Sequence, residues 1–276
     1  MGARDLLRQL RLLPTYFRLS VLTTAENKAM LWGSLLSSAI NLAAYAIFWN
    51  VITTQVPILT GAGIAIWGRG ELTALVGMSE VAWGFGSFFW MGTWEIHYYV
   101  TEEGLEKFLI RPVGPFFMIL ADNFWFGGLL QMAVGGVMVG LACVSFGLTV
   151  SLPGLLLGFL ALVIGQGALY ALWAGMACLS FWIGRNYALL EISDAIEVSF
   201  ARMPIDTMPH TVQQVLTFIL PVIYLTTVPT MLLLGMLPLS GGLLYLGIAA
   251  GLFFGWLLVF RFLFGRGLRR YSPVGG

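Results

Sequence analysis

Three long stretches of this chain carry no Asp, Glu, Lys or Arg. They cover residues 29–68, 123–184 and 207–260. A helix that crosses a bilayer needs about 20 mainly apolar residues, so each stretch is long enough for one span or two. The whole chain is 59% hydrophobic and 10% charged, whereas an ordinary soluble domain is about 25% charged. The sequence therefore predicts an all-α polytopic membrane protein.

Clusters of Pro, Gly and Ser divide two of these stretches, at residues 151–154 and 238–242. A further apolar run, from Leu72 to Tyr99, contains two glutamates. Six spans are predicted, at roughly 29–52, 72–99, 117–148, 155–183, 211–236 and 242–264. Pro221 and Pro229 can break the fifth span into a helix and a re-entrant piece, if the freed backbone groups are buried in protein or face water.

The distribution of Lys and Arg predicts the orientation of the spans, because these residues concentrate in cytoplasmic segments. With the N-terminus inside, the outer loops contain only Arg69, and Arg261 lies near the inner end of the last span. The inner segments contain Arg4, Arg8, Arg11, Arg18, Lys28, Lys107, Arg111, Arg185, Arg202, Arg266, Arg269 and Arg270. Both termini are then cytoplasmic, in a cell inner (plasma) membrane.

The predicted organisation has three parts: a cytoplasmic interfacial helix in residues 1–28, a six-helix transmembrane domain in 29–264, and a cytoplasmic tail in 265–276. Within residues 4–19 the apolar side chains lie close to helical spacing, and arginines occupy the other faces. That pattern is typical of a helix at the membrane surface. The alternative is a basic tail that only sets the topology.

The segment TEEGLEKFLIRPVGP, residues 101–115, places three glutamates, a lysine and an arginine between two apolar runs. Thr101 is a suitable N-cap for a helix that begins at the next residue. A helix dipole favours anions in the first turn and cations in the last. The charges follow this preference, with Glu102 and Glu103 first and Lys107 and Arg111 last. Glu103 and Lys107 also have the favourable i, i+4 spacing.

The apolar residues of the same segment form a narrow stripe at helical spacing: Leu105, Phe108 and Leu109. Pro112 is expected to end the helix. The prediction is a short amphipathic helix over 101–112 on the cytoplasmic side. The alternative is a solvated loop that packs back on its own bundle.

Three further features are candidates for function or packing. Glu80 lies inside the second predicted span, where a carboxylate indicates a functional site by default; it either faces a transport path or pins one helix to another. Residues 185–206 mix acidic and apolar side chains and predict a second amphipathic cytoplasmic helix. Five glycines have the spacing for close helix contact: Gly136, Gly140, Gly247, Gly251 and Gly255.

Two stretches resemble a known family. EEGLEKFLIRPVGPFF, from residue 102, resembles the first cytoplasmic loop of ABC-2-type permeases, the membrane subunits of certain ATP-driven exporters, and more narrowly of their compact six-span branch. The matching positions are Gly104, Leu105, Glu106, Phe108, Leu109, Arg111, Pro112 and Val113. The stretch from Ala201 to Gly235 resembles a later part of the same branch through Pro204, Pro221 and Pro229.

The resemblance implies that the first cytoplasmic loop is a coupling helix, which docks on a separate ABC ATPase subunit. The residues implied in docking are Glu102, Glu103, Leu105, Glu106, Phe108, Leu109 and Arg111. The 185–206 helix is a second possible contact. The chain contains no Gly-x-x-x-x-Gly-Lys-Ser/Thr stretch, so ATP and Mg²⁺ are expected on the partner.

The resemblance further implies a pair of permeases, identical or different, which opens a path outward through the lipid membrane when two ATPases close. Glu80 is then a candidate for lining that path. No catalytic residue, metal site, resident cofactor or nucleic-acid partner is expected. The alternatives are a secondary carrier or channel that works without ATP, and a membrane-anchored assembly factor without transport.

Overall fold

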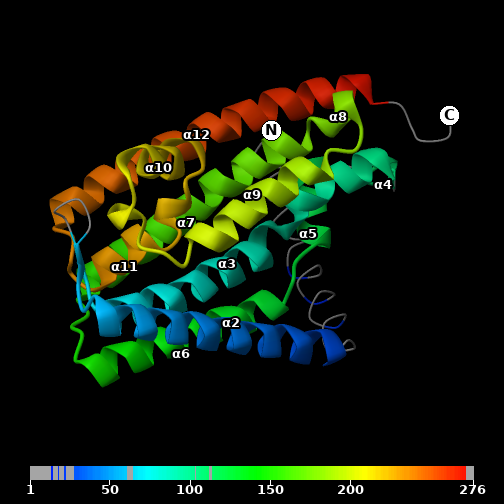
Figure 1. Ribbon diagram of the computed structural model, residues 1–276. Helices are drawn as coiled ribbons and strands as arrows, with labels where there is room; N and C mark the ends of the chain where they lie inside the picture. The colour runs from blue at the N-terminus through cyan, green and yellow to red at the C-terminus, as the bar shows by residue number, and fades with distance from the viewer. Residues whose placement is uncertain are drawn as a thin grey trace.

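The computed structural model describes residues 14, 18, 22, 28–60, 65–102, 104–111 and 114–271. Nearly all of them lie in helices that pack as an elongated bundle (Figure 1). The prediction of an all-α polytopic membrane protein is confirmed. The predicted interfacial helix of residues 1–28 falls almost wholly outside the described residues, as does the end of the predicted tail.

The first half of the chain forms α2 (Lys28–Gln55), β1 (Leu59–Thr60), β2 (Ile66–Trp67), α3 (Arg69–Thr101), α4 (Glu106–Leu109), α5 (Pro115–Asp122) and α6 (Gly127–Phe146). The second half forms α7 (Leu152–Ala177), α8 (Ser180–Ile183), α9 (Tyr187–Phe200), η1 (Ile205–Thr207), α10 (His210–Gln214), η2 (Val215–Ile219), η3 (Val222–Tyr224), α11 (Thr227–Leu233) and α12 (Leu239–Arg270).

Five helical segments of the described chain are long and apolar enough to cross a membrane: most of α2, α3, α6, α7 continued by α8, and α12. They correspond to the first, second, third, fourth and sixth predicted spans. The third span begins later than predicted, because α5 is a separate short helix. Asn123 lies at the break, where its side-chain amide donates to the Ile119 carbonyl oxygen at 2.8 Å and to the Tyr99 hydroxyl at 3.1 Å.

Helix α3 packs along α6 through backbone contact at glycines. A Cβ added to Gly135 would lie 2.5 Å from the Gly77 carbonyl oxygen, and Gly84 and Gly128 meet in the same way. The two contacts are seven residues apart on each helix, the repeat that keeps a contact on one face of two antiparallel helices. Small residues let membrane helices approach closely enough to gain dispersion energy and weak hydrogen bonds. These four glycines therefore hold α3 against α6.

The five glycines predicted to make close helix contacts do not make them. A Cβ on Gly136, Gly140, Gly247, Gly251 or Gly255 would meet no atom of the described residues within 4 Å. Spacing along one helix identifies a flat stripe, but a close contact also needs a partner backbone on that side. Helix α3 packs against the face of α6 that carries Gly128 and Gly135, and not against the face that carries Gly136 and Gly140.

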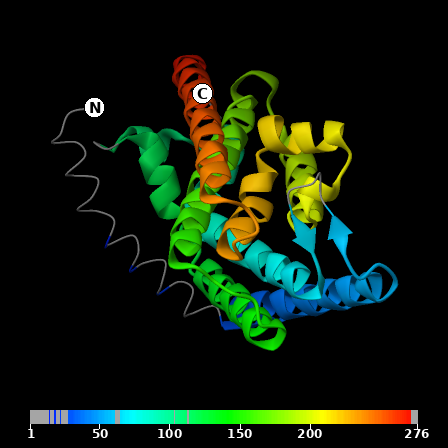
Figure 2. The same ribbon diagram turned by 90° about the vertical axis from the view of Figure 1, so that its left-hand side faces the viewer.

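The bundle has two distinct ends. At the hairpin end, β1 and β2 pair antiparallel just before α3 begins, and Gly70 of α3 lies against Phe146 at the end of α6. Figure 2 views the bundle from this side. At the opposite end, here called the α4 end, α4 lies near the C-terminal ends of α3 and α12 (Figure 1).

Helix α9 is amphipathic, as predicted for residues 185–206: it buries Leu190, Ser193 and Glu197 and leaves its outer face exposed. Its place differs from the expected one, because the segment runs along the bundle beside α3 and does not lie across one end of it.

At the α4 end, Arg185 forms an ion pair with Glu102 at 2.8 Å. Arg202, after α9, reaches Glu80 in the middle of α3. At the hairpin end, the single indole N–H of Trp67 is shared between the two carboxylate oxygens of Asp206, at 2.9 and 3.0 Å. The segment thus follows α3 from one end to the other.

The predicted fifth span, 211–236, is a bent pair rather than a straight crossing. Its halves, His210–Ile219 and Val222–Leu233, meet at 79°. The pair starts after Asp206, at the hairpin end, and it returns there, because Leu232 lies against Gly154 at the start of α7. Residues 185–206 therefore extend from the α4 end to the hairpin end, the crossing that was predicted for the fifth span. The bent pair that follows begins and ends at the hairpin end. The break anticipated at Pro221 is present.

We predict that Gly135→Leu destabilises the protein, because the new side chain would collide with the α3 backbone at Gly77. Overpacking of this kind costs about 1–3 kcal/mol. The adjacent Gly136→Leu is the matched control, since the space beside Gly136 is open. The measurement is the apparent unfolding temperature of both variants in mild detergent. Equal losses would contradict the assignment of the α3–α6 contact to Gly135.

Candidate functional site

The turn between α3 and α5 differs from the predicted helix. Thr101 is the last residue of α3, and its hydroxyl donates to the His97 carbonyl oxygen at 2.9 Å, so it does not cap a new helix at Glu102. Gly104 then adopts a left-handed φ of 73°, which breaks the helical path. Only Glu106–Leu109 is helical. The predicted helix over 101–112 is thus too long, and Glu103, Pro112 and Val113 lie outside the described residues.

The apolar stripe of this turn divides into an inner and an outer part. Leu105 and Phe108 are buried, and the Phe108 ring packs edge-on against Tyr99 at 4.8 Å. They cannot serve as surface anchors here, which corrects that expectation. Leu109 is 42% exposed and Ile110 is 83% exposed. The outward apolar edge of α4 is therefore Leu109 with Ile110, a residue that the helical spacing did not single out.

Tyr271 braces the α4 turn against the end of α12. Its hydroxyl accepts a hydrogen bond from the Leu105 backbone N–H at 3.0 Å and donates to the Glu106 carboxylate at 2.9 Å. Burial raises the pKa of the Tyr271 phenol, so the group stays a neutral donor at neutral pH. Because the Glu102–Arg185 pair also ties this turn to the start of α9, three distant segments of the chain meet at α4.

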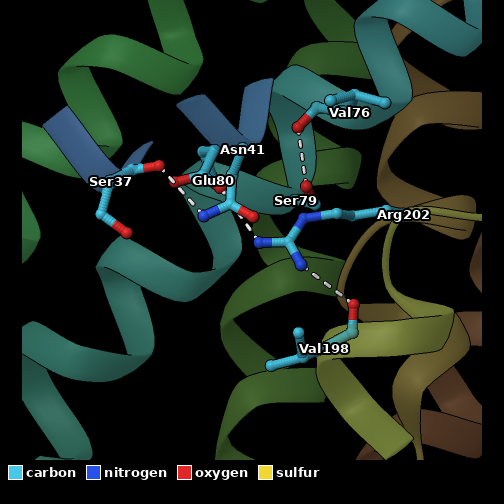
Figure 3. A network of polar contacts seen from close by, with 7 residues as sticks. All are labelled: Ser37, Asn41, Val76, Ser79, Glu80, Val198 and Arg202. Carbon is cyan, nitrogen blue, oxygen red and sulfur yellow. Dashed lines mark hydrogen bonds and ion pairs between the residues drawn. The ribbon is translucent and has the colours of Figure 1, made fainter. Parts of the chain in front are cut away.

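A buried ion pair lies in the middle of the bundle (Figure 3). The Arg202 guanidinium lies 3.2 Å from the Glu80 carboxylate, donates to the Val198 carbonyl oxygen at 3.0 Å, and packs 5.0 Å from the centre of the Tyr45 ring. Both charged side chains are at most 10% exposed. The pair joins α2, α3 and the segment after α9. This geometry matches the helix-pinning alternative for Glu80, and a role in lining a path stays a prediction.

The sequence did not reveal Arg202 as the partner of Glu80. The residue was counted among the cytoplasmic cations because it falls between the fourth and fifth predicted spans, at 155–183 and 211–236. A signal was nevertheless present: one carboxylate in an apolar span requires a compensating charge, and Arg202 is the cation that the structure brings to it.

We predict that breaking this pair destabilises the protein strongly. Removing one partner of a buried pair costs about 3–5 kcal/mol, because the remaining charge is left uncompensated. Glu80→Gln and Arg202→Gln should each lower the apparent unfolding temperature, and the double variant should lose less than the sum of the two.

The exposed pair between Glu102 and Arg185 supplies the control for this cycle. Glu102→Gln should cost no more than about 1 kcal/mol, as is usual for solvent-exposed ion pairs. Strictly additive losses from Glu80→Gln and Arg202→Gln would show that the two residues do not act as a pair.

Comparison with known protein families agrees with this architecture. A family model described as "ABC-2 family transporter protein" matches residues 39–275, most of the chain and all of the α4 turn. A search of curated proteins finds no match. The family is one of multi-pass membrane subunits without an ATPase motif of their own, and it implies ABC ATPase partners. The chain belongs to the ABC-2 family of transporter proteins.

Proposed function

We propose that this chain is the permease subunit of an ATP-driven exporter, and that a separate ABC ATPase docks on the α4 turn. The observation that carries the proposal is the outward apolar edge of Leu109 and Ile110 on a braced turn. Adjacent exposed apolar side chains with polar residues around them form a surface that a partner protein can bury. Glu102, Glu106 and Arg111 supply a polar rim, while Leu105 and Phe108 form the inner support.

The bracing of α4 suits a coupling element. A push on α4 would be carried through Tyr271 to α12, through the Glu102–Arg185 pair to α9, and directly along α3. Rigid packed elements move as bodies and do not deform continuously. Closure of the ATPases would thereby shift three long segments together and open a path outward.

The charge distribution supports a cytoplasmic α4 end. Cationic residues at this end include Lys107, Arg111, Arg185, Arg266, Arg269 and Arg270, whereas Arg69 lies at the hairpin end. Arg202 is buried and no longer counts as a cytoplasmic cation, but the excess of Lys and Arg at the α4 end, which orients membrane proteins, remains. Both termini are then cytoplasmic, in the plasma membrane.

The working transporter in this proposal contains two permeases and two ATPases. The apolar faces of α2, α6 and α12 are mostly exposed. Such faces suit membrane lipid and a second permease, either a copy of this chain or a different one.

The docking proposal predicts that Leu109→Asp with Ile110→Asp strongly weakens binding of the ATPase. Two carboxylates on the apolar edge would have to be desolvated on docking. The measurement is the amount of ABC ATPase that co-purifies with the tagged chain from its own cells in mild detergent. We expect a loss of about tenfold or more, the loss that 1.4 kcal/mol of binding energy produces.

Ile58→Asp is the matched control, because Ile58 is similarly exposed but lies in the hairpin end. It should leave the ATPase bound. If the wild-type chain brings no ATPase, the exporter proposal fails and an ATP-independent carrier takes its place. If the ATPase stays bound to the double variant, docking lies elsewhere.

We also predict that Tyr271→Phe loosens the α4 turn. The change removes both hydrogen bonds of the hydroxyl. A loss of about 1 kcal/mol per bond, about 2 kcal/mol in all, corresponds to about thirtyfold faster amide exchange. Hydrogen–deuterium exchange of residues 104–111 measures this. Tyr245→Phe, at the other end of α12, is the control and should leave that exchange unchanged. Unchanged exchange in Tyr271→Phe would exclude the bracing role.

A further inference from the structure

A cavity of about 790 Å³ lies between α3, the α5–α6 junction, α7 and α9. Its α3 wall runs from Trp83 to Tyr98, in the half of the helix nearer the α4 end. The volume is within the range of sites that hold drug-sized molecules. The cavity does not include the buried pair of Glu80 and Arg202.

Aromatic rings form much of the lining, and three helices contribute them. Trp94 of α3 meets Trp173 of α7 edge to face at 5.0 Å, and Trp173 meets Tyr170 at 4.8 Å. Tyr187 of α9 lies 6.3 Å from Trp94. The other aromatic lining residues are Trp83, Tyr98, Phe124 and Trp125. Ring faces carry negative electrostatic potential and attract cations.

The charged groups of the cavity are acidic. Glu95 comes from α3, Asp122 from the end of α5 and Asp194 from α9, and His97 adds one imidazole. No Lys or Arg is among the described lining residues. Arg202, on the segment that continues from α9, forms its ion pair with Glu80. Three carboxylates from three elements therefore face one aromatic-lined space without a cation in its wall.

Two indole donors of the lining lack an acceptor. The Nε1 atoms of Trp125 and Trp173 are buried, and neither has a hydrogen-bond partner in the described part of the chain. Trp173 is almost completely buried. Unpaired buried donors are rare in folded proteins, which sets these two indoles apart from the other rings of the lining.

We propose that this cavity binds a hydrophobic organic cation, of the lipophilic amine or onium class, as the cargo of the transporter. The aromatic faces would hold its apolar body, and Glu95, Asp122 and Asp194 would neutralise its charge. An anion would be repelled by these carboxylates. The cavity's place near the α4 end suits loading from the cytoplasmic side. The transport part of this inference rests on the proposed function.

The test uses tetraphenylphosphonium and tetraphenylborate, two ions of the same shape and opposite charge. Each is titrated separately against the purified full-length chain in an uncharged detergent, and equilibrium dialysis measures bound ion after subtraction of empty micelles. We expect saturable binding of the cation, at least about tenfold tighter than binding of the anion. Equal or tighter binding of the anion would overturn the proposal.

Variants then locate the binding site. Glu95→Gln with Asp194→Asn should weaken binding of the cation about tenfold or more, and Trp94→Leu should weaken it severalfold. Glu71→Gln is the control, because it removes one charge from α3 at the hairpin end and keeps an oxygen for the Gly68 N–H. Wild-type binding by the double variant would overturn the proposal. Should that variant fail to fold, exposed Asp122→Asn tests the same point.

Neither titration needs the ATPase, so the two proposals fail separately. If the ATPase co-purifies but tetraphenylphosphonium does not bind, the cargo class is wrong and the exporter assignment stands. If the cation binds but no ATPase is found, the cavity is a cation site in a protein that works without ATP.

Discussion

The ion pair between Glu80 and Arg202 decides how the second half of the chain is threaded. A charge inside an apolar bundle must be compensated, and the only described ion pair that reaches Glu80 comes from the segment after α9. That segment therefore lies beside α3 and not on the membrane surface. Once Arg202 is fixed, Asp206 reaches Trp67 at the hairpin end, and the bent pair that follows has to start and finish there.

Helix α3 connects every functional feature of the molecule. Its hairpin end follows directly after Trp67 of β2 and carries the start of the Gly70–Gly84 contact face. Its middle carries Glu80, and its other end leads into α4. The same helix supplies one wall of the aromatic cavity. A displacement of the α4 turn that moves α3 would thus also move one wall of the cavity and the Glu80 side of the buried pair. In the proposed exporter, ATPase closure and cargo release would share this one helix.

The cavity and the buried pair use charge in opposite ways. Arg202 is paired with Glu80 within the fold, and the buried Glu197 of α9 also lies within electrostatic range of it. The described lining of the cavity contains no Lys or Arg, and its three carboxylates are Glu95, Asp122 and Asp194. Both features border α9, which carries Asp194 and leads to Arg202. The helix that the buried pair holds beside α3 therefore also forms one wall of the acidic cavity.

The sequence by itself determined the membrane class and most of the spans, because side-chain hydropathy accumulates locally along a helix. It also located the polar turn before α5. It did not determine that α9 runs beside α3, that Gly77 and Gly135 meet while Gly136 stays open, or that Leu105 and Phe108 point inward. Each of these depends on a partner far away in the chain: a compensating charge, a facing backbone, a neighbouring ring. Only the tertiary structure decided them. Hydropathy and spacing describe one segment of the chain at a time, whereas burial and pairing depend on two segments that meet in space.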